Sequence, residues 1–128
     1  MNPQLKESYG FVFEDELLRE IDEVGKIHTY KAGTVILNYG QNVRSMPLLI
    51  SGAIKILRQN EEGDELVLYY LERGDTCTMT MTCCLGQQKS EIKAVAETDT
   101  TFINIPVGKM QEWIKKYPSW MSFVFESY

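Results

Sequence analysis

The stretch from Met46 to Leu71, MPLLISGAIKILRQNEEGDELVLYYL, holds three apolar runs that are separated by turn residues. Gly52 makes the first break, and the polar residues 60–64, NEEGD, make the second. Short apolar runs bounded by glycine and polar residues are typical of β-strands, and the second break predicts a hairpin loop. The sequence therefore predicts strands at Met46–Ser51, Ala53–Arg58 and Glu65–Leu71.

Glycines recur on both sides of this stretch, at Gly33, Gly40, Gly52, Gly63, Gly74 and Gly86. After the first interval they lie 12, 11, 11 and 12 residues apart, a spacing that indicates short antiparallel strands in a sandwich or barrel. The segment 26–30, KIHTY, alternates like a strand. Further strands are predicted at Thr34–Leu37, Ile92–Ala96 and Thr100–Ile105. We expect the last two to pair across residues 97–99, in a mainly β, antiparallel roll of about eight strands.

Both ends of the chain show helical periodicity instead. In Glu14–Val24 apolar residues recur at helical spacing, and Gly25 follows in a C-cap position. Val107–Tyr117 carries a second apolar stripe that ends at Pro118, and Trp120–Tyr128 begins a third helix. We expect the stripe of this last helix to stay partly exposed and to form a dimer interface. It consists of Trp120, Phe123, Val124 and Tyr128.

Length and composition limit the functions that the chain can have. Its 128 residues fit one domain, since single cores typically occupy roughly 100–150 residues. The 13 basic residues are scattered and the net charge is −5, so we expect no DNA binding by this domain itself. The longest apolar runs stop after five residues, which predicts no membrane span. Three cysteines without a signal peptide favour a reducing, cytoplasmic setting.

A single histidine, His28, excludes metal sites built on two or three imidazoles. Small barrel enzymes of the cupin type need such a set of ligands. We therefore predict no catalytic residue, no metal site and no cofactor, and we interpret His28 as a surface or packed strand residue.

Several segments resemble a known family in their order and spacing: Lys31–Ile36, Gly40, Leu48–Ile56, Glu62–Leu66, Gly74-Asp75 and Ser90–Ala96. The chain resembles the cyclic-nucleotide-binding-type sensor domains of Crp/Fnr transcription regulators from about Phe11 to Tyr128. The resemblance implies a double-stranded β-helix, or jelly-roll, with flanking α-helices. It also implies that residues 1–128 form one sensor domain ending at the start of a dimerisation helix, with the helix-turn-helix domain absent from this chain.

The same resemblance places a candidate ligand pocket in the segment that follows Gly74-Asp75. There the family has a glycine and a glutamate, and about ten residues later an Arg-Ser pair that binds the cyclic phosphate. Here Thr78 stands in place of the glycine, Met79 replaces the glutamate and Lys89 replaces the arginine, whereas Ser90 is retained. A thioether is a weak acceptor and an ammonium lacks the planar fork of arginine. Two damaged contacts cost about 3–6 kcal/mol, so we expect the pocket not to bind cyclic AMP.

Cysteines fill the rest of this candidate pocket, at Cys77, Cys83 and Cys84. They can be packing residues, since free cysteine is among the most buried residue types. They can also be a redox sensor or ligands of a soft metal, haem or iron–sulfur cluster. We expect three free thiols and no bound metal.

These observations favour the effector-sensing domain of a Crp/Fnr-like regulator, which is not an enzyme. Its partners would be an unknown small-molecule effector and, in the full-length protein, a second copy; DNA would be bound only through the missing domain. Two alternatives stay open. One is a cyclic-nucleotide-type regulatory domain of another protein, and the other is a thiol-based redox sensor domain.

Overall fold

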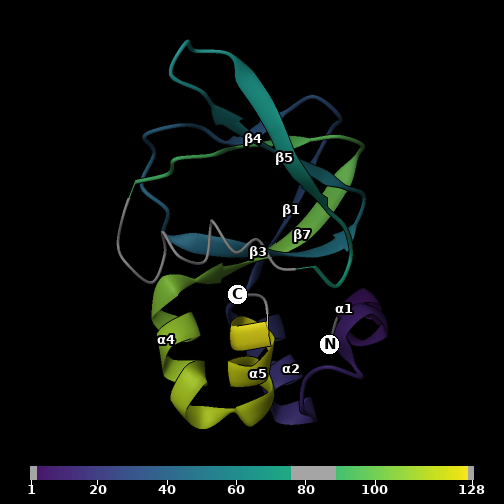
Figure 1. Cartoon of the computed structure of the whole chain (residues 1–128). Coiled ribbons are helices and arrows are strands. Elements are labelled where there is room, and N and C mark those ends of the chain that lie inside the picture. The colour runs from purple at the N-terminus through teal and green to yellow at the C-terminus, as the bar shows by residue number, and fades with distance from the viewer. Residues whose placement is uncertain (1–2, 76–88, 127–128) are drawn as a thin grey trace.

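The computed structural model describes residues 3–75 and 89–126, in which seven strands form two antiparallel sheets (Figure 1). The strands are β1 (Lys26–Tyr30), β2 (Val35–Leu37), β3 (Ser45–Ser51), β4 (Ile54–Gln59), β5 (Glu65–Leu71), β6 (Lys93–Ala96) and β7 (Thr100–Pro106). The first sheet has the order β1-β7-β3, and the second has the order β2-β6-β4-β5. The predicted class, an antiparallel β-roll with flanking helices, is confirmed, with seven strands in the described residues where about eight were expected.

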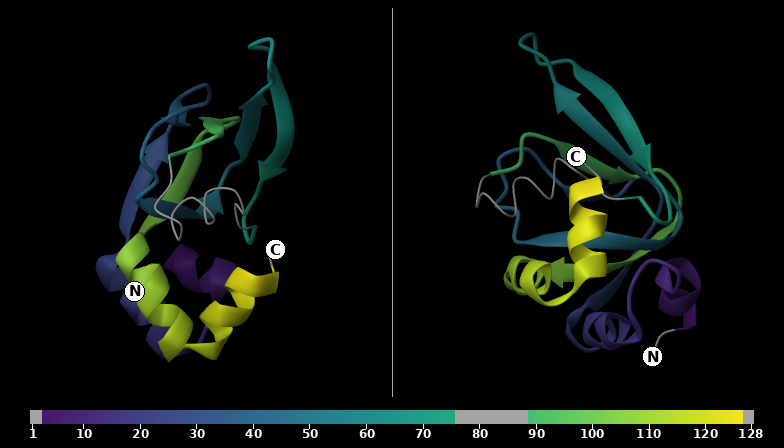
Figure 2. Two further views of the ribbon diagram at one scale, coloured as in Figure 1. Left: turned by 60° about the vertical axis from the view of Figure 1, so that its left-hand side comes forward. Right: turned by 60° about the horizontal axis from the view of Figure 1, so that its bottom comes forward.

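Four helices in the described residues lie together on one side of the roll (Figures 1 and 2). They are α1 (Pro3–Tyr9), α2 (Asp15–Val24), α4 (Val107–Lys116) and α5 (Pro118–Glu126). The last three match the predicted helices, and the N–H of Gly25 caps α2 by donating to Ile21. Helix α1 was not predicted, because only Leu5 and Tyr9 are buried in it, which is too few apolar positions for a visible stripe.

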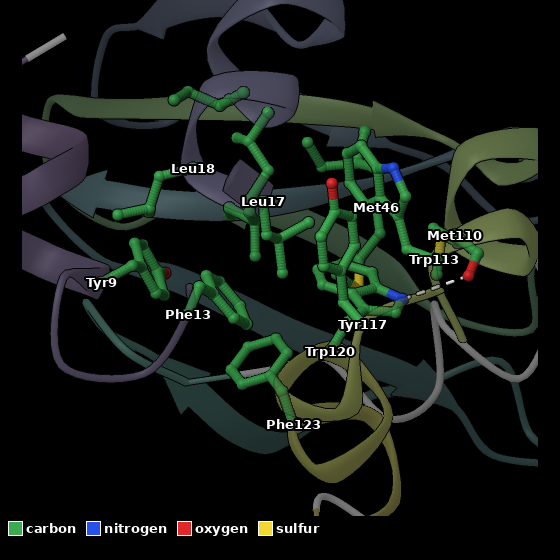
Figure 3. Close-up of a cluster of buried hydrophobic side chains, with 14 of the residues drawn as sticks. Tyr9, Phe13, Leu17, Leu18, Met46, Met110, Trp113, Tyr117, Trp120 and Phe123 are labelled. Atoms are coloured by element: carbon green, nitrogen blue, oxygen red, sulfur yellow. Dashed lines mark hydrogen bonds between the residues drawn. The ribbon is translucent and has the colours of Figure 1, made fainter. Parts of the chain in front are cut away.

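Strands β3 and β7 contribute side chains to two separate hydrophobic cores. Met46, Leu48 and Ile50 of β3 point into the core that the helices cover, part of which is shown in Figure 3. Leu49 lies in a second core between the two sheets. In β7, Ile103 belongs to the first core and its neighbour Phe102 to the second. Because successive side chains of a strand point to opposite faces, the run Met46–Ile50 is apolar throughout.

The expected pairing of the strands on either side of residues 97–99 is wrong. Strand β6 pairs with β2 and β4, whereas β7 pairs with β1 and β3 in the other sheet. The connection is a crossover held by side chains. Thr98 accepts from the N–H of Ala53 at 3.1 Å, and Asp99 accepts from the N–H of Ala32 at 3.0 Å. These hydrogen bonds fix the connection between β6 and β7, which in a hairpin would be fixed by pairing of the two strands.

The apolar stripe of α5 is not left exposed, contrary to the expectation. Trp120 and Val124 are at most 1% exposed and Phe123 is 8% exposed, and they belong to the core beneath the first sheet. Phe13 packs on Trp120 and Phe123 with ring centroids 5.6 and 5.0 Å away. The Nε1–H of Trp120 donates to the carbonyl of Met110 at 3.1 Å (Figure 3). Tyr128 lies outside the described residues.

Gly52 and Gly63 have the same backbone conformation but different surroundings, so comparing them distinguishes backbone strain from steric crowding. Gly52 and Gly63 both have φ near +87°, where a side chain costs about 1–2 kcal/mol. A Cβ on Gly63 would meet open space, whereas one on Gly52 would collide with the carbonyl oxygen of Asp99 and with Thr100. Gly52 therefore also makes a close approach to the crossover between the sheets.

We predict that Gly63→Ala lowers the free energy of unfolding by about 1–2 kcal/mol, and that Gly52→Ala lowers it by about 1–3 kcal/mol more, because the crossover has to shift. Urea unfolding of the two variants beside the wild type measures both changes. Equal losses in the two variants would contradict the close approach at Gly52.

Candidate functional site

A cavity of about 90 Å³ lies between the two sheets. Its apolar lining comes from both sheets and consists of Ile36, Leu37, Pro47, Ile54, Ile56, Leu71, Ala94 and Phe102, with Val43 from the loop before β3. Its polar lining consists of Asn42, Arg44, Ser45 and Asn104. An apolar cavity of roughly 150 Å³ accommodates benzene, so this one suits a group smaller than an aromatic ring.

Two of the residues predicted for the ligand pocket, Lys89 and Ser90, lie beside this cavity. Lys89 forms an isolated antiparallel bridge with Asn42, which lines the cavity. Ser90 donates its N–H to the carbonyl of Gln41 at 2.8 Å and is buried. The other predicted residues, Cys77, Thr78, Met79, Cys83 and Cys84, lie outside the described residues.

The hydroxyl of Ser90 is bonded within its own turn. Its Oγ donates to the carbonyl of Ile92 at 2.7 Å and accepts from the N–H of Ile92 at 3.2 Å. A serine hydroxyl has one proton to donate. In this arrangement that proton is directed to the backbone and not to a ligand.

At the other end of the predicted pocket, α1 contacts the turn that carries Gly74. The hydroxyl of Tyr9 donates to the carbonyl of Leu49 at 2.8 Å and accepts from the N–H of Gly74 at 3.4 Å. Burial raises the pKa of Tyr9 to about 12. The guanidinium of Arg73 lies 4.0 Å from the carboxylate of Glu7 in α1. Both side chains are more than half exposed, so this ion pair adds little to the stability of the fold. Sequence reasoning missed Tyr9, because one tyrosine before the first strand carries no pattern.

His28 packs among aromatic rings, as its interpretation as a strand residue predicts. Its ring centroid lies 6.1 Å from that of Tyr30 and 5.7 Å from that of Phe102. Within residues 3–75 and 89–126, no three His, Cys, Asp or Glu side chains come together to hold a metal ion. In the same part of the chain, no helix is both long enough and apolar enough to cross a membrane.

A second cluster of polar side chains joins the loop between β2 and β3 to the second sheet. The hydroxyl of Tyr39 donates to Glu65 at 3.0 Å, and Lys93 lies 3.5 Å from the same carboxylate. Desolvation, together with the charge of Glu65, raises the pKa of Tyr39 to about 12. All three side chains are partly exposed and pair with one another, so this group is part of the framework.

The sequence and the fold both match a known family. Residues 27–117 match the model of the cyclic nucleotide-binding domain, so the chain belongs to that family. Over 49 residues it is 31% identical to the cAMP-activated global transcriptional regulator CRP of Salmonella typhimurium. That match covers 38% of this chain and 23% of the relative, so it represents less than a quarter of the length of that regulator.

Solved structures of transcriptional regulators share the fold. The sensor domain of the transcriptional regulator DNR from Pseudomonas aeruginosa superposes with a TM-score of 0.74 at 18% identity, over 96% of this chain and 79% of that one. The Thermus thermophilus Catabolite Activator Protein superposes with a TM-score of 0.75 at 20% identity, over 88% of this chain and 52% of that one. At these identities the likeness establishes the fold.

We predict that Tyr9→Phe lowers the free energy of unfolding by about 1–2 kcal/mol near pH 8, because the carbonyl of Leu49 loses its donor. The loss should shrink with rising pH. An unfolded tyrosine ionises near pH 10, whereas folded Tyr9 keeps its proton up to about pH 12. The free energy of unfolding of the wild type therefore falls by about 1 kcal/mol by pH 11, and that of the variant does not show this fall.

Urea unfolding of both proteins between pH 8 and 11 measures this gap. Tyr70→Phe is the matched control, since Tyr70 is 50% exposed and its change should leave the free energy of unfolding near pH 8 almost unchanged. A gap between wild type and Tyr9→Phe that stays constant across this pH range would contradict the assignment.

Proposed function

We propose that this chain is the effector-sensing domain of a Crp/Fnr-like transcription regulator whose effector is not cyclic AMP. The observation that carries the proposal is the turn at Ser90. The single hydroxyl proton of Ser90 is donated to Ile92, so the one residue of the predicted phosphate site that this sequence retains has its proton already in use. Releasing it for a phosphate would leave the buried carbonyl of Ile92 without this donor, which costs about 1–3 kcal/mol.

The sequence of the pocket supports the same conclusion. Met79 offers a weak thioether acceptor where a ribose hydroxyl needs a carboxylate, and Lys89 offers a point charge where the phosphate needs a fork.

The whole regulator would act on DNA through a helix-turn-helix domain outside this chain. This domain has a net charge of −5, which disfavours contact of the domain itself with the phosphates of DNA. We propose a cytoplasmic homodimer held by a helix that continues from α5, and no enzymatic activity. Since the predicted stripe of α5 is buried, the contact would use its other face, where Met121 is 42% exposed.

We predict that the chain shows no binding of cyclic AMP or cyclic GMP at micromolar concentration in calorimetric titration. The combined change Thr78→Gly, Met79→Glu and Lys89→Arg should recover binding in part, because it restores the two contacts but not the purine contacts. Lys115→Arg, an equivalent change on the exposed side of α4, is the matched control. A low-micromolar isotherm for the wild type would overturn the proposal.

A thiol-based sensor remains the second candidate function, because three cysteines lie between Gly74 and Lys89. We predict that Cys77, Cys83 and Cys84 are free thiols in the resting protein. Alkylation of the native and the unfolded protein, followed by mass measurement, counts the free and the buried thiols. A labile disulfide, or stoichiometric metal in elemental analysis, would favour the thiol-based sensor over the proposal above.

A further inference from the structure

A second hollow, of about 190 Å³, adjoins the cavity between the sheets. Its lining includes Lys26 and His28 of β1, and it shares Arg44, Ser45 and Asn104 with the first cavity. The two hollows therefore meet around three polar residues. One is lined mostly by aliphatic side chains, and the other is lined mostly by side chains that donate hydrogen bonds.

Strand register brings these donors together. Lys26 lies directly opposite Asn104 of β7, and His28 lies opposite Phe102. Side chains two residues apart on a strand share a face, and Phe102 lines the cavity between the sheets. Lys26 and His28 therefore lie on the inner face of the first sheet, beside the cavity.

Arg44 is held at the place where β3 begins. Its carbonyl accepts from the N–H of Val107 at 2.9 Å, so the first residue of α4 fixes its backbone. The next residue, Ser45, pairs with Pro106 of β7. The backbone of Arg44 is thus held on both sides, so ligand binding would have to order only its exposed side chain.

Among the residues that the structure describes, no carboxylate pairs with the cations of this hollow. Five ion pairs join other basic residues to carboxylates, but neither Lys26 nor Arg44 forms one within the described part of the chain. Lysine and arginine can only donate, and the planar fork of arginine fits both oxygens of a carboxylate.

We infer that the two hollows form one site for a small organic acid. Its carboxylate is held by Arg44 and Lys26 in the outer hollow, from which its apolar chain runs so that the end of the chain lies in the cavity between the sheets. The inference rests on the proposed function and names the chemical class of the effector. The aliphatic lining disfavours a purely inorganic anion, and the volume of about 90 Å³ limits the part of the chain inside the cavity to a few carbon atoms.

The test is calorimetric titration of the chain with hexanoate, acetate and 1-hexanol. Acetate carries the charge without the body, and hexanol carries the body without the charge. Hexanoate should bind at least about tenfold more tightly than either, because it alone makes both sets of contacts. Equal binding of hexanoate and hexanol, or no binding of hexanoate, would overturn the inference.

Two variants assign the contacts. Arg44→Gln should lower the affinity for hexanoate at least about tenfold and leave the affinity for hexanol unchanged. Arg19→Gln is the matched control, since it removes the same charge from α2, outside both hollows. Ala94→Val partly fills the cavity, so it should lower the affinity for hexanoate towards the affinity for acetate. Hexanoate binding that is insensitive to Arg44→Gln would also overturn the inference.

The outcome is separate from that of the proposed function. Nucleotide binding would overturn the proposed function, whatever hexanoate does. If neither hexanoate nor a nucleotide binds, this inference fails and the proposed function stands with a different effector.

Discussion

The β3–β7 pair buries side chains on both of its faces, and each face belongs to a different core. Outward side chains such as Leu48 and Ile103 pack under the helices, and inward side chains such as Leu49 and Phe102 face the second sheet. Because a shift of one residue in the register would exchange the two sets, this pair fixes the position of the helices and the lining of the cavity together. The cavity between the sheets therefore depends on the same alternation that anchors the helical layer.

The helical layer also contacts the turn before the predicted ligand pocket. Tyr9 bonds to Gly74 through its hydroxyl, and its ring packs edge-on to Phe123 with centroids 6.3 Å apart. Phe13 stacks on Tyr9 at 5.6 Å and also contacts Trp120. A continuous chain of contacts thus joins α5 to Gly74.

The sequence predicted the elements well and their neighbours less well. Glu65–Leu71 is a strand with those bounds, and His28 lies in a strand among aromatic rings. The pairing across residues 97–99 failed because a short polar gap has the same pattern in a hairpin and in a crossover. The stripe at Trp120 failed for a related reason, because periodicity reveals a buried face but not the partner that buries it.

The candidate site shows the same limit. Lys89 and Ser90 were found through the resemblance, and Ser90 proved to be bonded within its own turn. Lys26, Arg44 and Asn104 were missed, because they stand in three separate segments that only the register of the first sheet brings together. The roles of Thr78, Met79 and the three cysteines stay predictions, since these residues lie outside the described part of the chain.

The most direct test of this account is the change in backbone amide ¹H–¹⁵N chemical shifts when the chain is titrated with hexanoate. The account predicts saturable shifts that are largest at Arg44, Ala94 and Asn104, which line the two hollows. Shifts confined to α1, α2, α4 and α5, or no saturable shift at any amide, would contradict it.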